Sequence, residues 1–354
     1  MNSESHYLWT KSNEHEDLYF KLWKRKLIIL QIVNHFKTGA IIMEKLKQLQ
    51  KIKELYANGD NIIQYLKSIG NNDTNTIEDI LISYDFQAGS YIQGFSKNQE
   101  YNHKYCKTLS EIIDKIGNVQ SIIEVGVGEA TTLNTVIRNL ENKPSDILGF
   151  DISWSRLKFA KEFLTDIKLN GVKLFTANLF NIPLLDNSID VVYTSHSIEP
   201  NGGKEEEALK ELYRITNKYL ILLEPSFEFA NDEARARMKK NGYITKLHAT
   251  AKKLGYQIKE HRLFEHSVNP LNPTELIIIE KNDKSSNNSN LVCPISNTEL
   301  VNYSESLLFS KESFLAYPVI DGVPCLLKEN SILASHLLTD YEEYKKSHNI
   351  VFNV

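Results

Sequence analysis

Cysteine is scarce in this sequence, and the few residues are irregularly placed. Only three occur among 354 residues, at Cys106, Cys293 and Cys325, so a secreted protein held together by disulfides is not expected. The first residues contain no basic stretch followed by an apolar core, which argues against a signal peptide. The longest apolar run near the start, Leu27–Val33, is interrupted by Gln31 and is too short to span a bilayer. We therefore expect a cytoplasmic protein.

An excess of positive charge is also missing. The 41 basic and 45 acidic residues give a formal net charge of −4, which is unlike the balance of a dedicated nucleic-acid binder. No Asn-Pro-Pro-Tyr-type segment and no basic face with interleaved aromatic residues points to base modification. The composition, 42% hydrophobic and 24% charged, is typical of a globular protein with an ample core. The length suits two domains, or one domain with additions.

The N-terminal third has helical periodicity. Apolar residues recur at three- and four-residue spacing in the segments 43–57, 59–69, 74–83 and 98–116. We expect residues 43–115 to form a helical region that packs beside the following domain and helps to close its active site. For residues 1–42 three interpretations stay open: a loosely attached extension, an interfacial basic helix, or a native protein that begins at Met43.

From Ser121 the pattern changes to short apolar runs that alternate with helical stretches. The runs cover 121–125, 146–150, 172–177, 189–194, 219–223, 256–264 and 274–280, and the helices lie near 131–141, 154–168, 204–217 and 231–253. Such alternation predicts an α/β fold with a Rossmann-like, seven-stranded, mostly parallel sheet. No helix separates the last two runs, so they should form an antiparallel hairpin at one edge.

The remaining domain boundaries follow from the composition of the segments. We place the α/β domain at residues 116–282. Residues 283–290 are polar and read as a linker, and residues 291–354 are expected to be a small β-rich domain with a helical tail.

A glycine-rich turn follows the first predicted strand. Gly126 and Gly128 can adopt positive φ and let a ligand approach the backbone, and Glu124 precedes them in the strand. Asp151 ends the second predicted strand, where its carboxylate could accept hydrogen bonds from ribose hydroxyls. After the third strand, the Asn178 amide and the Leu179 backbone N–H could read an adenine edge.

In their order and spacing these segments resemble the class I S-adenosylmethionine-dependent methyltransferases. The resemblance implies S-adenosylmethionine as the cofactor, with Gly126 and Gly128 flanking its methionine moiety and Asp151 holding its ribose. It also implies that Asn178 stands near the adenine and that Glu124 orients the amino-acid end. Ala130 departs from the family's third glycine. A nicotinamide-dependent oxidoreductase fits less well, because the predicted terminal hairpin replaces the second βαβ half that such an enzyme would need.

The segment after the fourth strand faces the acceptor in such a sheet. Here it is polar and contains His196 and Glu199, while Glu224 ends the fifth strand. We take these three as candidate catalytic residues. His196 is the candidate general base, because its unperturbed pKa lies near neutrality, and the carboxylates could orient it or bind a cationic acceptor. For each of the three, a role in fixing the loop stays open.

The C-terminal segment ends in a Tyr317-Pro-Val-Ile-Asp-Gly-Val-Pro run that resembles the small zinc-ribbon-like domains of the Trm112 type. Domains of that group act as partners or activators of methyltransferases. A zinc ribbon needs pairs of cysteines, but here Ser296 follows Cys293 at the pair spacing, and Cys325 is the only other thiol nearby. We therefore expect no metal.

Together these features predict an S-adenosylmethionine-dependent methyltransferase that acts on oxygen or nitrogen of a small-molecule acceptor. A cofactor-binding regulatory or scaffold protein that docks a partner through the Trm112-like domain is one alternative. A protein or RNA methyltransferase is another. The sequence does not identify the acceptor, and it leaves a homo-oligomer open.

Overall fold

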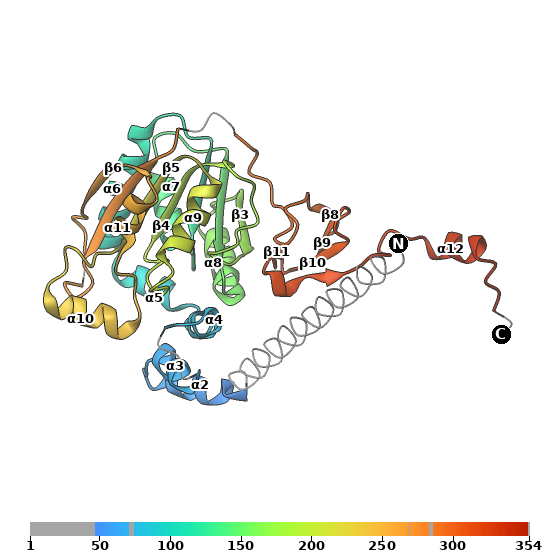
Figure 1. The fold of residues 1–354 in the computed structure, drawn as a ribbon, viewed down its shortest axis with the longest axis horizontal. Helices are drawn as coiled ribbons and strands as arrows, with labels where there is room; N and C mark the ends of the chain where they lie inside the picture. The colour runs from blue at the N-terminus through green and yellow to red at the C-terminus, as the bar shows by residue number, and fades with distance from the viewer. Residues whose placement is uncertain (1–46, 71–73, 268, 283–285, 353–354) are drawn as a thin grey trace, which may run out of the picture. The chain divides into compact units, whose positions relative to one another are not determined.

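A computed structural model describes residues 47–70, 74–267, 269–282 and 286–352 (Figure 1). The chain divides into two compact units, residues 1–71 and residues 72–354. The interpretations offered for residues 1–42 lie outside the described residues. Among the residues that are described, no helix has the length and apolar character needed to cross a membrane.

Among its described residues, the first unit contains two short helices, α2 (Leu49–Ala57) and α3 (Ile62–Gly70). Both coincide to within a residue or so with segments that the sequence predicts to be helical. Ile52, Ile62 and Leu66 are buried, as the three- and four-residue apolar spacing requires for one face of each helix.

The second unit is built on a seven-stranded sheet with the order β3-β2-β1-β4-β5-β7-β6. Its strands are β1 (Ser121–Val125), β2 (Asp146–Asp151), β3 (Val172–Thr176), β4 (Ile189–Ser195), β5 (Thr216–Pro225), β6 (Gln257–Leu263) and β7 (Thr274–Glu280). The first five are parallel, and β7 runs antiparallel to both β5 and β6. This confirms the predicted sheet and its antiparallel edge hairpin.

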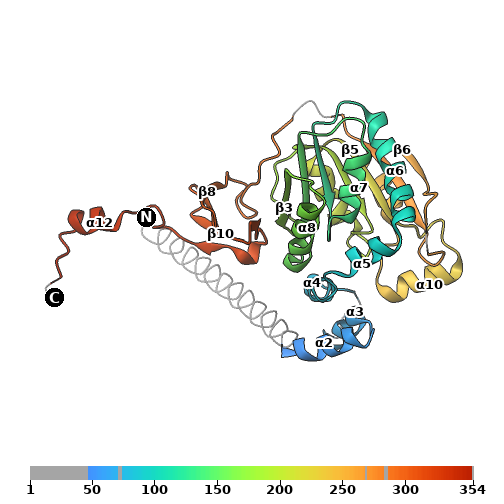
Figure 2. The ribbon, with the colours of Figure 1, turned by 180° about the vertical axis from the view of Figure 1, so that it is seen from behind.

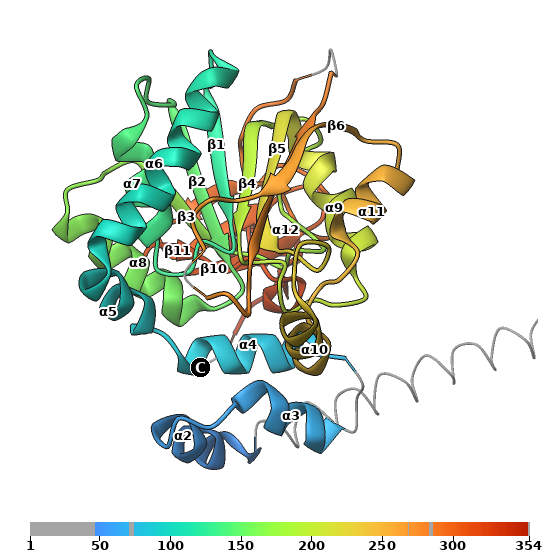
Figure 3. The same ribbon diagram turned by 90° about the vertical axis from the view of Figure 1, so that its left-hand side faces the viewer.

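Helices cover both faces of this sheet (Figure 3): α6 (Gln99–Ile116), α7 (Thr131–Asn139) and α8 (Trp154–Asp166) on one, α9 (Glu205–Ile215) and α11 (Leu247–Lys253) on the other. The helices α4 (Ile77–Phe86), α5 (Ser90–Lys97) and α10 (Asp232–Asn241) lie toward one end of the strands. One apolar core lies between the sheet and helices α6, α7 and α8, and a second lies between the sheet and helices α9 and α11. Central strands covered on both faces explain the nearly unbroken apolar runs of β1 and β4.

Two local predictions are wrong. The single helix expected over 231–253 is two helices, because Gly242 adopts a left-handed conformation (φ 69°) and ends α10. The helix expected over 74–83 begins only at Ile77, because Thr76 caps its first turn and forms a reciprocal capping box with Asp79.

The C-terminal part forms a small antiparallel sheet with the order β11-β10-β9-β8, and β12 pairs with β10. Its elements are β8 (Val301–Ser304), β9 (Leu307–Ser310), β10 (Leu315–Ile320), β11 (Val323–Pro324), the 3-10 turn η1 (Lys328–Asn330), β12 (Ile332–Leu333) and α12 (Tyr341–Ser347). This agrees with the small β-rich domain predicted from sequence.

The C-terminal sheet adjoins β3, the edge strand of the large sheet (Figures 1 and 2). Thr176 and Cys325 form a parallel bridge, and the Leu326 N–H lies 2.9 Å from Thr176 Oγ1 and 3.2 Å from the Thr176 carbonyl oxygen. Tyr317 and Leu326 belong to the same apolar core as Phe175 of β3. The C-terminal sheet therefore covers an edge strand whose backbone groups would otherwise be open to pairing.

Candidate functional site

A pocket opens where the parallel strands end at their carboxyl termini. Its empty space, counted out to its mouth and including open solvent, is about 920 Å³. Its walls come from the loops after β1, β2, β3 and β4, and its roof comes from helices α4 and α5. The residues that line the pocket include Tyr84, Tyr91, Glu124, Gly126, Gly128, Asp151, Arg156, Asn178, Leu179, Ser195, His196, Ser197 and Asn201.

The glycine turn lies against two other parts of the site. Gly126 has φ 66°, and a Cβ there would lie 2.4 Å from Cβ of Ser197. Gly128 has φ 53°, and a Cβ there would lie 3.2 Å from Nη1 of Arg156. Glycine is thus required for the left-handed backbone and for the close approach of the loop after β4.

Ala130 occupies the position of the family's third glycine and is fully buried. It adopts φ 59° immediately before α7. A left-handed conformation costs an L-residue about 1–2 kcal/mol, so this alanine holds a strained backbone as well as a packing position.

Asp151 lies at the end of β2, where the predicted ribose contact requires it. Its carboxylate accepts hydrogen bonds from the N–H groups of Gly128 (3.0 Å) and Ser153 (2.9 Å). Burial raises its pKa, although these bonds and the nearby Arg156 oppose the shift. A carboxylate offers about four acceptor positions, so two remain for a pair of ligand hydroxyls. The chemistry of this group therefore fits a ribose.

Asn178 follows β3, and its side-chain oxygen accepts a hydrogen bond from the Phe180 N–H (3.0 Å). The amino end of the amide is then the part that can meet a ligand. Asn178 and Leu179 both line the pocket, as the sequence predicts.

Glu124 is buried beside the glycine turn, and the Tyr193 hydroxyl donates to its Oε2 (2.9 Å). Burial raises its pKa to about 8, against the opposing effect of the Tyr193 hydrogen bond. Without a ligand, this carboxyl group is therefore mostly protonated at neutral pH. A cation placed beside it would favour its charged form.

Arg156 is a site residue that the sequence analysis missed. It comes from the first turn of α8, is almost fully buried, and packs its guanidinium against the rings of Tyr84 (4.8 Å) and Tyr91 (4.3 Å). Nε donates to the Tyr84 carbonyl oxygen (2.9 Å), but the buried Nη2 has no hydrogen-bond partner among the described residues. A buried guanidinium nitrogen without a partner indicates a place for a ligand oxygen. One sign of this position was present in the sequence, because Arg156 follows shortly after Asp151, the predicted ribose contact.

Two carboxylates, of Glu129 and Asp85, connect the helical roof to the pocket walls. Glu129, next to the glycine turn, accepts the N–H groups of Gly89 (2.9 Å) and Ile92 (2.7 Å) at the start of α5. Asp85 at the end of α4 accepts a hydrogen bond from the Ser153 hydroxyl (2.7 Å). These bonds hold helices α4 and α5 against the glycine turn and the loop after β2.

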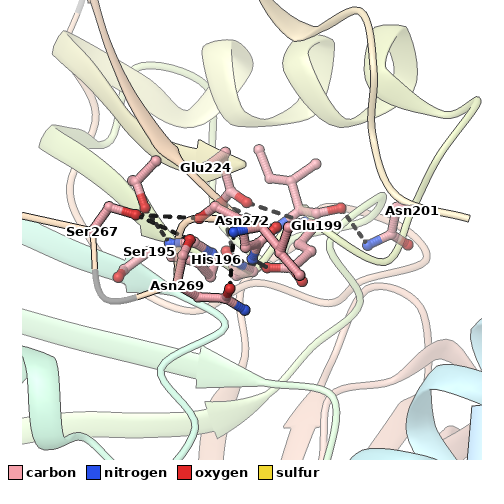
Figure 4. A network of polar contacts seen from close by, with 12 residues as sticks. Ser195, His196, Glu199, Asn201, Glu224, Ser267, Asn269 and Asn272 are labelled. Atoms are coloured by element: carbon pink, nitrogen blue, oxygen red, sulfur yellow. Dashed lines mark hydrogen bonds and ion pairs between the residues drawn. The ribbon is translucent and has the colours of Figure 1, made fainter. Parts of the chain in front are cut away.

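The loop after β4 positions His196 between two partners (Figure 4). Nδ1 lies 2.9 Å from Glu199 Oε2 and Nε2 lies 2.8 Å from Thr274 Oγ1, so both ring nitrogens are engaged. Burial lowers the pKa of His196, but the hydrogen bond and charge of Glu199 outweigh it and raise the pKa above 6.5. The pKa of Glu199 falls below 4.5, because the bond to His196 outweighs burial. An imidazole whose two nitrogens both have partners is poorly suited to accept a proton from an acceptor.

Glu224 is fully buried and does not line the pocket. Its two carboxylate oxygens accept the backbone N–H groups of Ser197 (3.0 Å), Ile198 (3.1 Å) and Glu199 (3.1 Å). Burial raises its pKa to about 7. The three candidate catalytic residues are thus brought together, but Glu199 and Glu224 contact the loop and its histidine rather than the cavity.

Comparison with known proteins agrees with this arrangement. Residues 123–223 match the family model described as a methyltransferase domain. No curated protein matches the sequence. Several solved structures are similar to part of the chain. One is an S-adenosylmethionine-dependent methyltransferase from Methanococcus maripaludis (20% identity, 57% of this chain and 95% of that chain, TM-score 0.43).

Two further solved structures resemble a similar share of the chain. One is a methyltransferase from Aquifex aeolicus (16% identity, 48% of this chain and 87% of that chain, TM-score 0.38). The other is the magnesium protoporphyrin IX methyltransferase of Synechocystis with bound S-adenosylmethionine (14% identity, 51% and 80%, TM-score 0.39). The match of residues 123–223 identifies a methyltransferase domain in this part of the chain.

Proposed function

We propose that this enzyme methylates an oxygen or nitrogen atom of a small molecule. The observation that carries the proposal is the pocket itself, which lies under helices α4 and α5 and behind the loop after β4. A roofed cavity suits an acceptor that enters whole better than one carried on a polymer. The net charge of −4 adds no attraction for nucleic acid.

The residues of the glycine turn after β1, together with those that follow β2 and β3, would hold the cofactor. Asp151 would accept the ribose hydroxyls, Asn178 and Leu179 would meet the adenine, and the buried Nη2 of Arg156 would donate to a cofactor oxygen. Gly126 and Gly128 would leave room for the methionine moiety, with Glu124 beside its positive charge. When bound, the cofactor supplies an electrophilic methyl group on a sulfonium.

The loop after β4 would hold the acceptor. Ser195, Ser197 and Asn201 line this side of the pocket, and Ser197 Oγ is buried without a hydrogen-bond partner among the described residues. In a displacement from a sulfonium, orientation of the attacking atom supplies much of the rate. We assign His196, Glu199 and Glu224 to holding this loop in place, with Ser197 contacting the acceptor.

We also propose that the C-terminal domain is a Trm112-like module that acts on its own chain by covering β3. Cys293 Sγ lies 3.3 Å from the Tyr317 hydroxyl oxygen, and Cys325 lies in the strand segment beside β3. The two thiols are therefore used in packing. This arrangement supports the enzyme hypothesis over a scaffold that would present the same surface to another protein.

The test uses the full chain, a fractionated metabolite extract and cofactor labelled in its methyl group. Mass spectrometry should find label in a product of low mass, and Asp151→Ala should lower its amount severalfold at a cofactor concentration near the Kd of the wild type. Label found only in protein or RNA added in parallel would contradict the small-molecule assignment while leaving the methyltransferase activity intact.

A further inference from the structure

A group of histidines and glutamates gathers on the sheet edge beyond the pocket. None of its members lines the pocket. They come from the loop after β5, from α11, from β6 and from β7, and we call them the His–Glu cluster: Glu228, His248, His261 and Glu275.

Distances within the cluster match those around a single metal ion. Nε2 of His261 lies 3.0 Å from Oε2 of Glu275 and 3.6 Å from Oε2 of Glu228. Nδ1 of His248 lies 3.7 Å from the other oxygen of Glu228, and one ligand atom from each of Glu228, His248 and His261 can be chosen so that all lie within 4.8 Å of one another. Tetrahedral zinc with bonds of about 2.0–2.1 Å separates its ligand atoms by roughly 3.3 Å. Small side-chain movements would complete the site.

Hydrogen bonding alone leaves the cluster poorly satisfied. Two carboxylates face the same Nε2 of His261, and a single N–H can serve only one of them well. The rings of His248 and His261 are stacked with centroids 3.6 Å apart, which disfavours charging both. Glu275 is almost fully buried. A divalent cation beside it would favour its charged form, which burial otherwise disfavours.

The surroundings also resemble those of metal ligands. The Ser226 hydroxyl donates to Glu275 Oε2 (2.8 Å), which fixes the orientation of the buried carboxylate. The Phe229 ring lies 5.0 Å from the ring of His261 and shields one side. Glu228 is about one-third exposed and provides a path for an ion from solvent. Oriented ligands with one open side are the features expected of a usable site.

We propose that the His–Glu cluster binds one divalent transition-metal ion, for which zinc is the best match. Two imidazole nitrogens and two carboxylate oxygens are donors that zinc accepts in tetrahedral sites. Thr274, the residue before Glu275, contacts His196 of the acceptor loop. The ion would thus hold the loop after β5 and the start of β7 next to the loop after β4, which contains His196.

The experiment uses the full chain, stripped of metal with a chelator, dialysed, and titrated with zinc alone. Elemental analysis and calorimetry should give one zinc per chain. His248→Ala should weaken zinc binding by at least roughly 100-fold, the upper end of what changes outside the ligand set cause. Glu228→Gln is the second variant, because its partly exposed side chain can change without loss of fold.

Two controls locate the ion. His336→Ala removes an exposed histidine outside the cluster, and Cys293→Ser removes a thiol of the C-terminal domain. Both should keep one zinc per chain. The proposal is overturned if the wild type retains no zinc, if both cluster variants bind zinc as the wild type does, or if Cys293→Ser is the variant that loses it.

Discussion

Nδ1 of His196 lies 2.9 Å from Oε2 of Glu199, and the two side chains hold the loop between β4 and α9 in its observed shape. His196 itself adopts φ 57°, a left-handed conformation that histidine tolerates better than most residues. Since Thr274 engages the second ring nitrogen, no ring nitrogen is left for the acceptor. We therefore infer that His196 and Glu199 hold the loop between β4 and α9 in place and that His196 does not take up a proton from the acceptor.

Replacing His196 by asparagine tests this assignment. Asparagine also tolerates the left-handed conformation and keeps a polar side chain, so kcat should stay within about tenfold of wild type, while KM for the acceptor rises. A general base would instead contribute roughly 10²–10⁴-fold to the rate. His103→Asn, at an exposed position of α6, is the matched control. A fall in kcat beyond about 100-fold, with loss of the acid limb of the pH profile, would restore His196 as the base.

The pKa shifts of His196 and Glu199 predict how the free energy of unfolding depends on pH. The pKa of His196 is raised, so its contribution is complete below 6.5 and is lost as the pH rises through the raised value. The pKa of Glu199 is lowered, so its contribution is complete above 4.5 and is lost only as the pH falls through the lowered value. In urea unfolding, Glu199→Gln should therefore be most destabilising near pH 6 and least near pH 9. An equal or larger effect near pH 9 would mean that the pair is not ionic.

Glu124 predicts a proton released on cofactor binding. Its pKa of about 8 in the free protein means that it is mostly protonated at pH 7. The positive charge of the cofactor beside it should lower that pKa and expel the proton. Calorimetry in buffers of different ionisation enthalpy should show release approaching one proton per chain, absent in Glu124→Gln. Proton uptake, or release that persists in the variant, would contradict this account of Glu124.

Arg156→Met should weaken cofactor binding, because it keeps much of the apolar stem against Tyr84 and Tyr91 but removes the donors. A hydrogen bond to a charged group contributes about 1.5–3 kcal/mol, so Kd should rise roughly 10–100-fold. Arg138→Met, in the exposed last turn of α7, is the control and should leave Kd unchanged. Equal affinities for the two variants would mean that Nη2 of Arg156 has no ligand partner.

Local patterns determined what could be predicted from the sequence. The strands alternate with helices in a regular way, and Asp151 is found because it directly follows an apolar run. Contacts between segments that are distant in the chain could not be predicted from the sequence. Thr274 is 78 residues from His196, and the members of the His–Glu cluster are spread over four elements. Patterns of cysteine spacing, which were the basis for expecting no metal, carry no information about such a cluster.

The predicted helix boundaries were wrong where the backbone conformation of one residue determined the end of a helix. Gly242 ends α10 because it takes up a left-handed cap, yet the apolar periodicity continues past it. The strained φ of Ala130 was equally invisible, since alanine gives no sign of it.

Titration calorimetry decides whether the glycine turn and Asp151 bind S-adenosylmethionine. Asp151→Ala removes two charge-assisted hydrogen bonds to the ribose, so the affinity should fall at least roughly tenfold. Asp146→Ala, at the exposed start of the same strand, pairs with Lys173 and should bind as the wild type does. Unchanged affinity in Asp151→Ala would contradict the claim, since the ribose would then be held elsewhere.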